Sequence, residues 1–192
     1  MHALIVTANP NPKSLTHGVA QKIADSVLRT NQDHTVEIAD LAAENFDPCY
    51  KIEDMHAFHG DAKSGSEILA EQHRVDRADA LVLVHPIYWW SFPALLKGWI
   101  DRVFTHGWAY DDTSGDKIIK KLHDLKVHIV SIAGADVSTI ARHGYYGAMK
   151  TQIHHGIFDY CGAPVETSEL IFQSDPEICL RRADGIGTRI FP

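Results

Sequence analysis

Apolar segments of strand length alternate with amphipathic segments of helix length along this chain, and this alternation restricts the possible folds most. Strands are predicted over residues 3–8, 35–41, 80–84, 126–132 and 165–172, and the segments 3–8 and 80–84 are apolar enough for buried strands. The segments between and after them predict helices over residues 16–28, 66–77, 93–104, 146–161 and 176–183. Strands that alternate with helices form a parallel sheet with helices on both faces, so we expect an α/β fold.

Five strands in this pattern favour the sheet order 2-1-3-4-5, with its topological switch point between strands one and three. The loops after strands one, three and four then converge on one crevice. The 192 residues contain no repeat or linker, so residues 1–192 are expected to form a single domain. The remaining segments predict loops over 42–65, 105–115 and 133–144, and a short helix over 117–123.

Charge and hydropathy exclude several classes of protein. The 18 Lys and Arg against 25 Asp and Glu give a formal net charge of −7, which disfavours general binding to nucleic acid. No segment has the roughly 18 uncharged apolar residues of a membrane span, and the N-terminus lacks the pattern of a signal peptide. Cys49, Cys161 and Cys179 are widely spaced and indicate free thiols in a reducing compartment. We therefore expect a cytoplasmic protein.

The turn after the third predicted strand concentrates aromatic residues in the sequence Pro86-Ile87-Tyr88-Trp89-Trp90-Ser91-Phe92. Large aromatic side chains most often belong to the core. On a regular strand, however, adjacent side chains alternate between faces, so Trp89 and Trp90 cannot both point into one core. At least one of them should line the crevice. Because open α/β sheets bind planar ligands at such a turn, we predict that it holds a flavin ring.

The loop after the first strand, residues 9–16, joins a strand to the start of a helix. Hydroxyls at Ser14 and Thr16, together with free N–H groups and the helix dipole, favour an anionic phosphate at this place. Capping of the helix by Ser14 or Thr16 is the simpler alternative. The loop matches neither the GxxxxGK[ST] pattern of NTPases nor the GxGxxG pattern of dinucleotide-binding folds.

The loop after the fourth strand combines small residues with a nearby histidine. Ala133-Gly134-Ala135 allows the backbone to approach a ligand edge, and His143 follows eight residues after Ala135. A histidine beside a redox ring can donate a proton or stabilise negative charge, although most histidines serve the surface or packing. No metal site is expected, because His56-x-x-His59 and His154-His155 lack partners at a recognised ligand spacing.

Taken together, the loop at 9–16, the stretch from Pro86 to Phe104 and Gly107-Trp108-Ala109-Tyr110 resemble the NAD(P)H:quinone oxidoreductase branch of the flavodoxin-like fold. The resemblance covers nearly the whole chain, to about residue 172. It implies a flavin-dependent enzyme in which NAD(P)H reduces the flavin and a quinone or similar planar acceptor then takes two electrons, in a ping-pong sequence. It also implies a homodimer.

The resemblance further implies roles for individual residues. Those that match the region holding the flavin phosphate are Ser14, Leu15 and Thr16. Those that match the turn under the isoalloxazine are Pro86, Ile87, Tyr88, Trp89 and Trp90. Gly134 matches the glycine at the pyrimidine edge, and His143 matches a histidine that assists hydride transfer. Tyr110 matches an aromatic residue of the substrate pocket, which the second subunit of the family's homodimer often contributes.

Two departures from the family pattern leave alternatives open. A tyrosine that the mammalian-type enzymes carry six residues before the histidine is replaced here by Val137. Either Tyr145 or Tyr146 substitutes from the other side, or the proton relay is shortened. The resemblance implies FAD as the cofactor. Because the chain is shorter than those enzymes, FMN, which lacks the adenine half of FAD, is the alternative.

Relatives of this branch also serve as ancillary subunits of potassium efflux systems. A regulatory flavoprotein that binds a membrane transporter is therefore the rival function. A one-electron carrier is less favoured, because such a carrier needs no substrate pocket and this chain has expanded aromatic loops.

Overall fold

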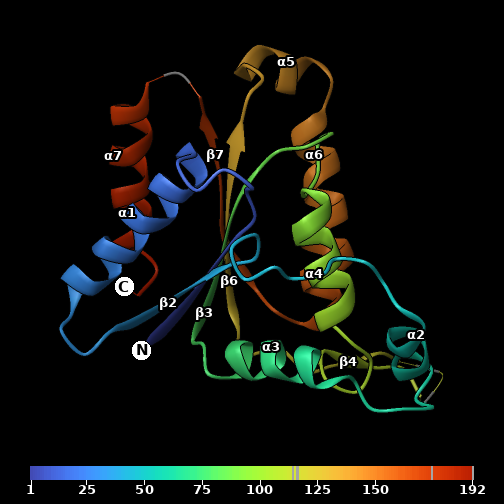
Figure 1. The fold of residues 1–192 in the computed structure, drawn as a ribbon. Helices are drawn as coiled ribbons and strands as arrows, with labels where there is room; N and C mark the ends of the chain where they lie inside the picture. Colours follow the sequence, from blue (N-terminus) through green and yellow to red (C-terminus); the bar gives the residue numbers. More distant parts are fainter. Residues whose placement is uncertain (114, 116, 174, 192) are drawn as a thin grey trace.

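The computed structural model describes residues 1–113, 115, 117–173 and 175–191. Its centre is a parallel sheet of five strands in the order β2-β1-β3-β6-β7 (Figure 1). The strands are β1 (His2–Thr7), β2 (Thr35–Asp40), β3 (Ala80–Pro86), β6 (Lys126–Ala133) and β7 (Val165–Phe172). This order is the predicted 2-1-3-4-5, so the predicted α/β fold and sheet topology are confirmed.

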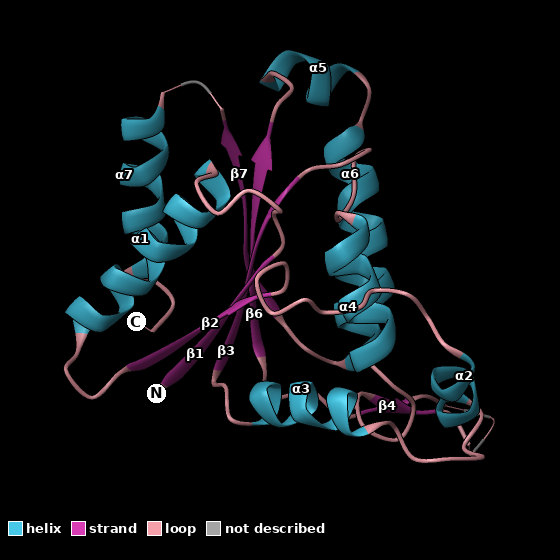
Figure 2. Ribbon diagram, in the orientation of Figure 1, coloured by secondary structure: helices cyan, strands magenta, loops and turns pink. Residues whose placement is uncertain are grey.

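Helices cover both faces of the sheet (Figures 1 and 2). One face packs against α1 (Leu15–Thr30) and α7 (Pro176–Gly187). The other packs against α3 (Ser66–Asp76), α4 (Ala94–Val103) and the continuous helix of α6 (Tyr145–Met149) and the π-helix η1 (Lys150–Asp159). Because both faces are covered, the central strand β3 is buried along its whole length, which explains its unbroken apolar sequence.

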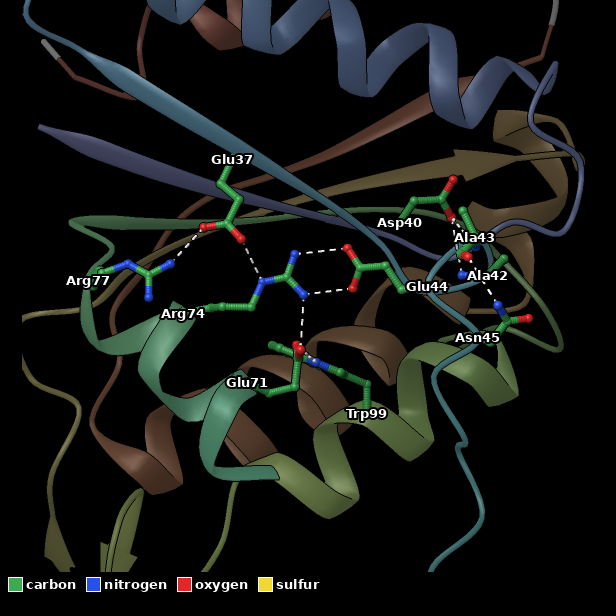
Figure 3. Close-up of polar contacts among 10 residues, drawn as sticks. All are labelled: Glu37, Asp40, Ala42, Ala43, Glu44, Asn45, Glu71, Arg74, Arg77 and Trp99. Carbon is green, nitrogen blue, oxygen red and sulfur yellow. Dashed lines mark hydrogen bonds and ion pairs between the residues drawn. The ribbon is translucent and has the colours of Figure 1, made fainter. Parts of the chain in front are cut away.

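Hydrogen bonds and ion pairs fasten α3 to the sheet edge and to α4. Arg74 on α3 contacts the carboxylates of Glu37 on β2, Glu44 in the following loop and Glu71 on α3 (Figure 3). The other carboxylate oxygen of Glu71 accepts a hydrogen bond of 2.8 Å from the indole N–H of Trp99 on α4. Glu44 and Glu71 hold the pKa of the Arg74 guanidinium above its usual value, against the opposite effect of burial.

The structure corrects four predictions about the connecting segments. The predicted loop at 42–65 contains α2 (Ile52–Phe58), and the predicted loop at 133–144 contains α5 (Val137–Arg142). The predicted helix at 117–123 is wrong: β5 (Ile119–Lys120) pairs there with β4 (Tyr110–Asp111) in a small antiparallel sheet. That β4 lies within the predicted loop at 105–115, of which residue 114 falls outside the described residues. All four elements are too short to give a clear periodic pattern.

Two predicted helices differ from the structure, one in its hydrogen bonding and one in its length. The predicted helix at 146–161 exists and is followed by Gly162 in the left-handed region (φ 88°), but its central ten residues have π-helical hydrogen bonds. Helix α7 continues to Gly187, beyond the predicted end at 183. Among the residues that the structure describes, no helix combines the length and the hydropathy needed to cross a membrane.

Candidate functional site

The loops after β3 and β6 form one cleft at the carboxyl edge of the sheet. Its volume is about 150 Å³, and it is lined by Ile87, Trp89, Trp90, Ala133, Gly134, Ala135 and Ile140. Adjacent strands in a parallel sheet end at the same edge, so two segments more than 40 residues apart meet there. Four residues predicted for the flavin site, Ile87, Trp89, Trp90 and Gly134, therefore lie together.

A tight hairpin presents the two tryptophans. The backbone N–H and C=O of Tyr88 bond those of Ser91 at 3.2 and 3.1 Å, so Trp89 and Trp90 are the central residues of the turn. Both have positive φ angles, 48° and 60°, as in a type I′ turn, which usually carries Asn or Gly. A non-glycine residue in the left-handed region costs about 1–2 kcal/mol. Backbone strain of this kind clusters at functional sites.

The two tryptophan side chains differ in their surroundings. Trp89 is 93% exposed, although it borders the cleft. Trp90 stacks on the ring of Tyr145, with 3.5 Å between ring centroids and 11° between planes. The ring of His143 also stacks on Tyr145, with 5.3 Å between ring centroids and 27° between planes. Phe92, at the end of the turn, enters the core instead.

The stack settles where the two alternative tyrosines lie. Tyr145 is between Trp90 and the exposed His143, whereas Tyr146 borders a separate small cavity beside Ile129. Val137, the position of the missing tyrosine, is 61% exposed in the first turn of α5. Of the two tyrosines, Tyr145 is therefore the one placed next to His143 and to the turn.

The loop after β1 leads into α1 with Ser14 as its N-cap. The Ser14 hydroxyl accepts a hydrogen bond from the His17 N–H at 3.4 Å, so the capping alternative is confirmed for this residue. Thr16 is buried, and its hydroxyl accepts from the Asn9 amide at 3.1 Å. The N–H groups of Leu15 and Thr16 lie in the first turn of the helix, where the backbone offers donors to an anion.

Ser14 is joined through His17 to Asp40, and neither His17 nor Asp40 was among the predicted site residues. His17 Nδ1 lies 2.9 Å from the Ser14 hydroxyl, and His17 Nε2 lies 2.8 Å from a carboxylate oxygen of Asp40 at the end of β2. The spacing of Ser14 and His17 is that of neighbours on a helix surface, which was a usable signal. Asp40 comes from another strand, and only the fold brings it to this place.

The loop after β6 is held by the start of α5. The Asp136 carboxylate accepts hydrogen bonds from the Thr139 N–H at 2.7 Å and the Ser138 hydroxyl at 2.8 Å, and these bonds lower the pKa of Asp136. Gly134 lies just before this cap, and a Cβ added to it would meet nothing within 4 Å. The small residue thus leaves the backbone open toward the cleft.

Tyr110 lies away from the tryptophan turn within the chain. It belongs to β4, which Figure 1 shows at the opposite end of the helical layer from α5. There it borders a second cavity of about 400 Å³, together with Tyr50, Phe58, Asp101, Tyr160 and other residues. Burial raises the pKa of Tyr110 to about 12. A single chain therefore does not bring Tyr110 to Trp89 and Trp90.

A buried residue beneath the turn was not predicted. His85 is fully buried at the end of β3, and its ring nitrogens lie 3.0 Å from the Pro86 carbonyl and 3.0 Å from the Ser131 hydroxyl. Burial lowers the pKa of His85 to about 4, because the charged form loses its hydration. The sequence placed His85 beside the predicted strand but gave no sign of the partner on β6.

Known proteins resemble this chain in sequence and in structure. The family described as having a flavodoxin-like fold matches residues 1–178. A Mus musculus protein named ribosyldihydronicotinamide dehydrogenase (quinone) is 31% identical over 198 residues, covering 90% of this chain and 81% of that protein. An uncharacterized NAD(P)H oxidoreductase of Haemophilus influenzae is 29% identical over 167 residues, covering 84% and 79%.

Among solved structures, one of an NAD(P)H:quinone oxidoreductase from Methanothermobacter marburgensis matches with a TM-score of 0.84 and 27% sequence identity. The match covers 98% of each chain.

Proposed function

Because the chain belongs to the flavodoxin-like fold family and is an oxidoreductase, we propose that it uses a bound flavin to carry two electrons from NAD(P)H to quinones or similar planar acceptors. The observation that carries this proposal is the turn of Trp89 and Trp90, whose strained backbone presents two large aromatic side chains at the cleft. Its relatives named as NAD(P)H oxidoreductases and quinone reductases support the choice of donor and acceptor.

The residues of the cleft fit a flavin ring. Ile87, Trp89 and Trp90 offer apolar and aromatic surface, while the open backbone at Gly134 leaves room for a polar ring edge. Leu15 and Thr16, in the first turn of α1, carry N–H groups suited to a flavin phosphate. When bound, a flavin supplies the hydride chemistry, alternating between NAD(P)H and the acceptor.

The protein's own residues bind and orient the reactants and move a proton. Pro86 and Tyr88 shape the turn that carries the tryptophans, and the Trp90–Tyr145 stack gives a flat wall beside it. His143, exposed at the end of α5 and stacked on Tyr145, can exchange a proton with a quinone or similar acceptor at the opening of the cleft. Val137 occupies the position of the family's tyrosine and has no hydroxyl group. We therefore assign the hydroxyl group of the proton relay beside His143 to Tyr145.

Tyr110 enters the proposal through a second copy of the chain. It lies in a different cavity from Trp89 and Trp90, so it can line a substrate pocket only if another subunit supplies it. We therefore propose a homodimer. FAD is the proposed cofactor, with FMN as the alternative. The free cysteines, of which Cys161 and Cys179 are buried, agree with a cytoplasmic location.

The decisive experiment combines cofactor identification with turnover. The purified protein is expected to be yellow, and mass spectrometry of the heat-released cofactor should identify FAD or FMN. NADH or NADPH oxidation should then exceed that of free flavin with at least one of several quinones. Absence of bound or bindable flavin would contradict the proposal. Bound flavin without turnover would favour the rival function, a regulatory flavoprotein that binds a potassium transporter.

A further inference from the structure

His85 occupies an apolar column of the core. On β3 it follows Leu81 and Leu83 on the face that packs against α4, and the sheet register places it beside Ser131 of β6. Its side chain is 0% exposed. Burying an imidazole is unfavourable unless its nitrogens are hydrogen-bonded. An aliphatic residue would continue the column without that requirement, so the bonds made by His85 show what it contributes.

Those bonds fix the position of the proton on the ring. Nδ1 lies 3.0 Å from the Pro86 carbonyl oxygen, which can only accept, so Nδ1 carries the hydrogen and donates. Nε2 is then an acceptor, and the Ser131 hydroxyl donates to it at 3.0 Å. A single tautomer therefore satisfies both nitrogens and connects β6 to the first peptide of the aromatic turn.

The same ring also contacts the end of the turn. Phe92 packs edge-on against His85, with 4.8 Å between ring centroids and 87° between planes. At the start of the turn, the Ile87 N–H donates to the Ile132 carbonyl at 2.9 Å, so the Pro86–Ile87 peptide is held on both sides. The chain thus leaves and re-enters the core at points that His85 contacts.

We propose that His85 is the positioning residue of the aromatic turn: by holding Pro86, Phe92 and Ser131 together, it sets where Trp89 and Trp90 meet a flavin ring. The strained φ angles of the tryptophans make such support necessary, because strain persists only where the surroundings determine the backbone. This inference rests on the proposed function for its ligand, but the effect on the turn itself is independent of any ligand.

Two amide substitutions separate the hydrogen bonds of His85. In His85→Asn, the side-chain nitrogen takes the place of Nδ1 and still donates to the Pro86 carbonyl. In His85→Gln, the amide takes the place of Nε2 and reaches Ser131 only. We expect His85→Gln to weaken binding of added FAD and FMN about tenfold or more and to shift the reduction potential of bound flavin, with His85→Asn within about threefold of wild type.

The turn is also measured without flavin, by the near-ultraviolet circular dichroism of the tryptophans. His85→Gln is expected to change this signal most, whereas His85→Asn should change it less, because His85→Asn keeps the bond to Pro86 and loses only the bond to Ser131. Unchanged spectra and affinities in His85→Gln would overturn the inference. The inference would also be overturned if both variants lost flavin affinity and tryptophan signal equally, in proportion to their loss of thermal stability. A residue with a merely structural role would behave in that way.

Ser131→Ala serves as the second variant if His85→Gln does not fold. It removes one hydroxyl, leaves Nε2 of His85 without its donor, and should weaken flavin binding about threefold with the tryptophan signal altered. Wild-type affinity and spectrum in Ser131→Ala would then contradict the inference. A wild-type protein that binds no flavin would instead contradict the proposed function, and the flavin-free spectra would still decide whether His85 positions the turn.

Discussion

Trp89 and Trp90 occupy backbone conformations that ordinarily belong to glycine or asparagine. An exposed tryptophan in such a conformation loses free energy to strain and regains little from burial. At the residue scale, the turn therefore trades stability for an aromatic surface at the cleft. The cost of the strain can be measured by comparing a substitution that removes the indole and relieves the strain with one that removes the indole only.

Trp89→Gly should raise the free energy of unfolding relative to Trp89→Ala by about 1 kcal/mol, because glycine relieves the positive φ while both variants lose the indole. Urea unfolding of the flavin-free proteins measures this difference. Both variants should bind flavin more weakly than wild type. Flavin affinity equal to wild type in both would show that Trp89 is not part of the site.

His143 and Tyr145 act at the same scale through one aromatic stack. His143→Gln should lower kcat about 10- to 100-fold with flavin retained, since a general acid or base contributes about that much or more. Tyr145→Phe preserves the stack on Trp90 and removes only the hydroxyl, so it should lower turnover less than Tyr145→Leu. Steady-state kinetics with one quinone checks the order, and wild-type rates in His143→Gln would remove it from the mechanism.

At the scale of elements, α1 and α7 pack closely at a glycine. A Cβ added to Gly187 would lie 2.5 Å from the Ser26 Cβ and 2.7 Å from the Ile23 carbonyl oxygen, so the helices would have to separate. Gly185, on the same helix, has nothing within 4 Å of such a Cβ. Alanine substitutions at these two glycines therefore separate the effect of helix packing on stability from the effect of helix propensity.

Gly187→Ala should destabilise the protein by about 2 kcal/mol or more, through the clash with backbone atoms. Gly185→Ala should stabilise it by up to about 1 kcal/mol, because alanine is the better helix former. Thermal or urea unfolding of both variants measures the difference. Similar effects of the two substitutions would contradict the close packing of α1 on α7.

At the scale of the whole molecule, two histidines lie in the sheet as neutral groups. Burial lowers the pKa of both His85 and His128 to about 4, from an ordinary value of 6.5. Below pH 6.5 the unfolded chain takes up protons at these positions while the folded protein does not. Their contribution to stability is therefore complete above pH 6.5 and is lost as the pH falls toward 4.

We expect the free energy of unfolding to fall by about 3 kcal/mol for each of these histidines between pH 7 and pH 4. Urea unfolding at several pH values measures the slope, and His128→Gln serves as the matched variant because it cannot be protonated. A slope unchanged in His128→Gln would show that His128 does not bind protons on unfolding.

Periodicity in the sequence determined the large elements and the sheet order. Strands β1, β3 and β6 are apolar segments of strand length, and all five strands are separated by helical segments, so local spacing is enough to specify them. The same information placed Trp89, Trp90 and Gly134 at one edge, because parallel strands end together. Helices α2 and α5 and the pair β4–β5 were not predicted, since their few residues carry too little periodic signal.

Only the tertiary structure decided which distant side chains meet. The pairing of His85 with Ser131, the stack of Trp90 on Tyr145 and the contact of His17 with Asp40 each join segments from different elements. The position of Tyr110, in a cavity apart from the tryptophan turn, depends on the same packing. A sequence specifies local conformation through nearby residues, whereas these contacts depend on how whole layers pack against the sheet.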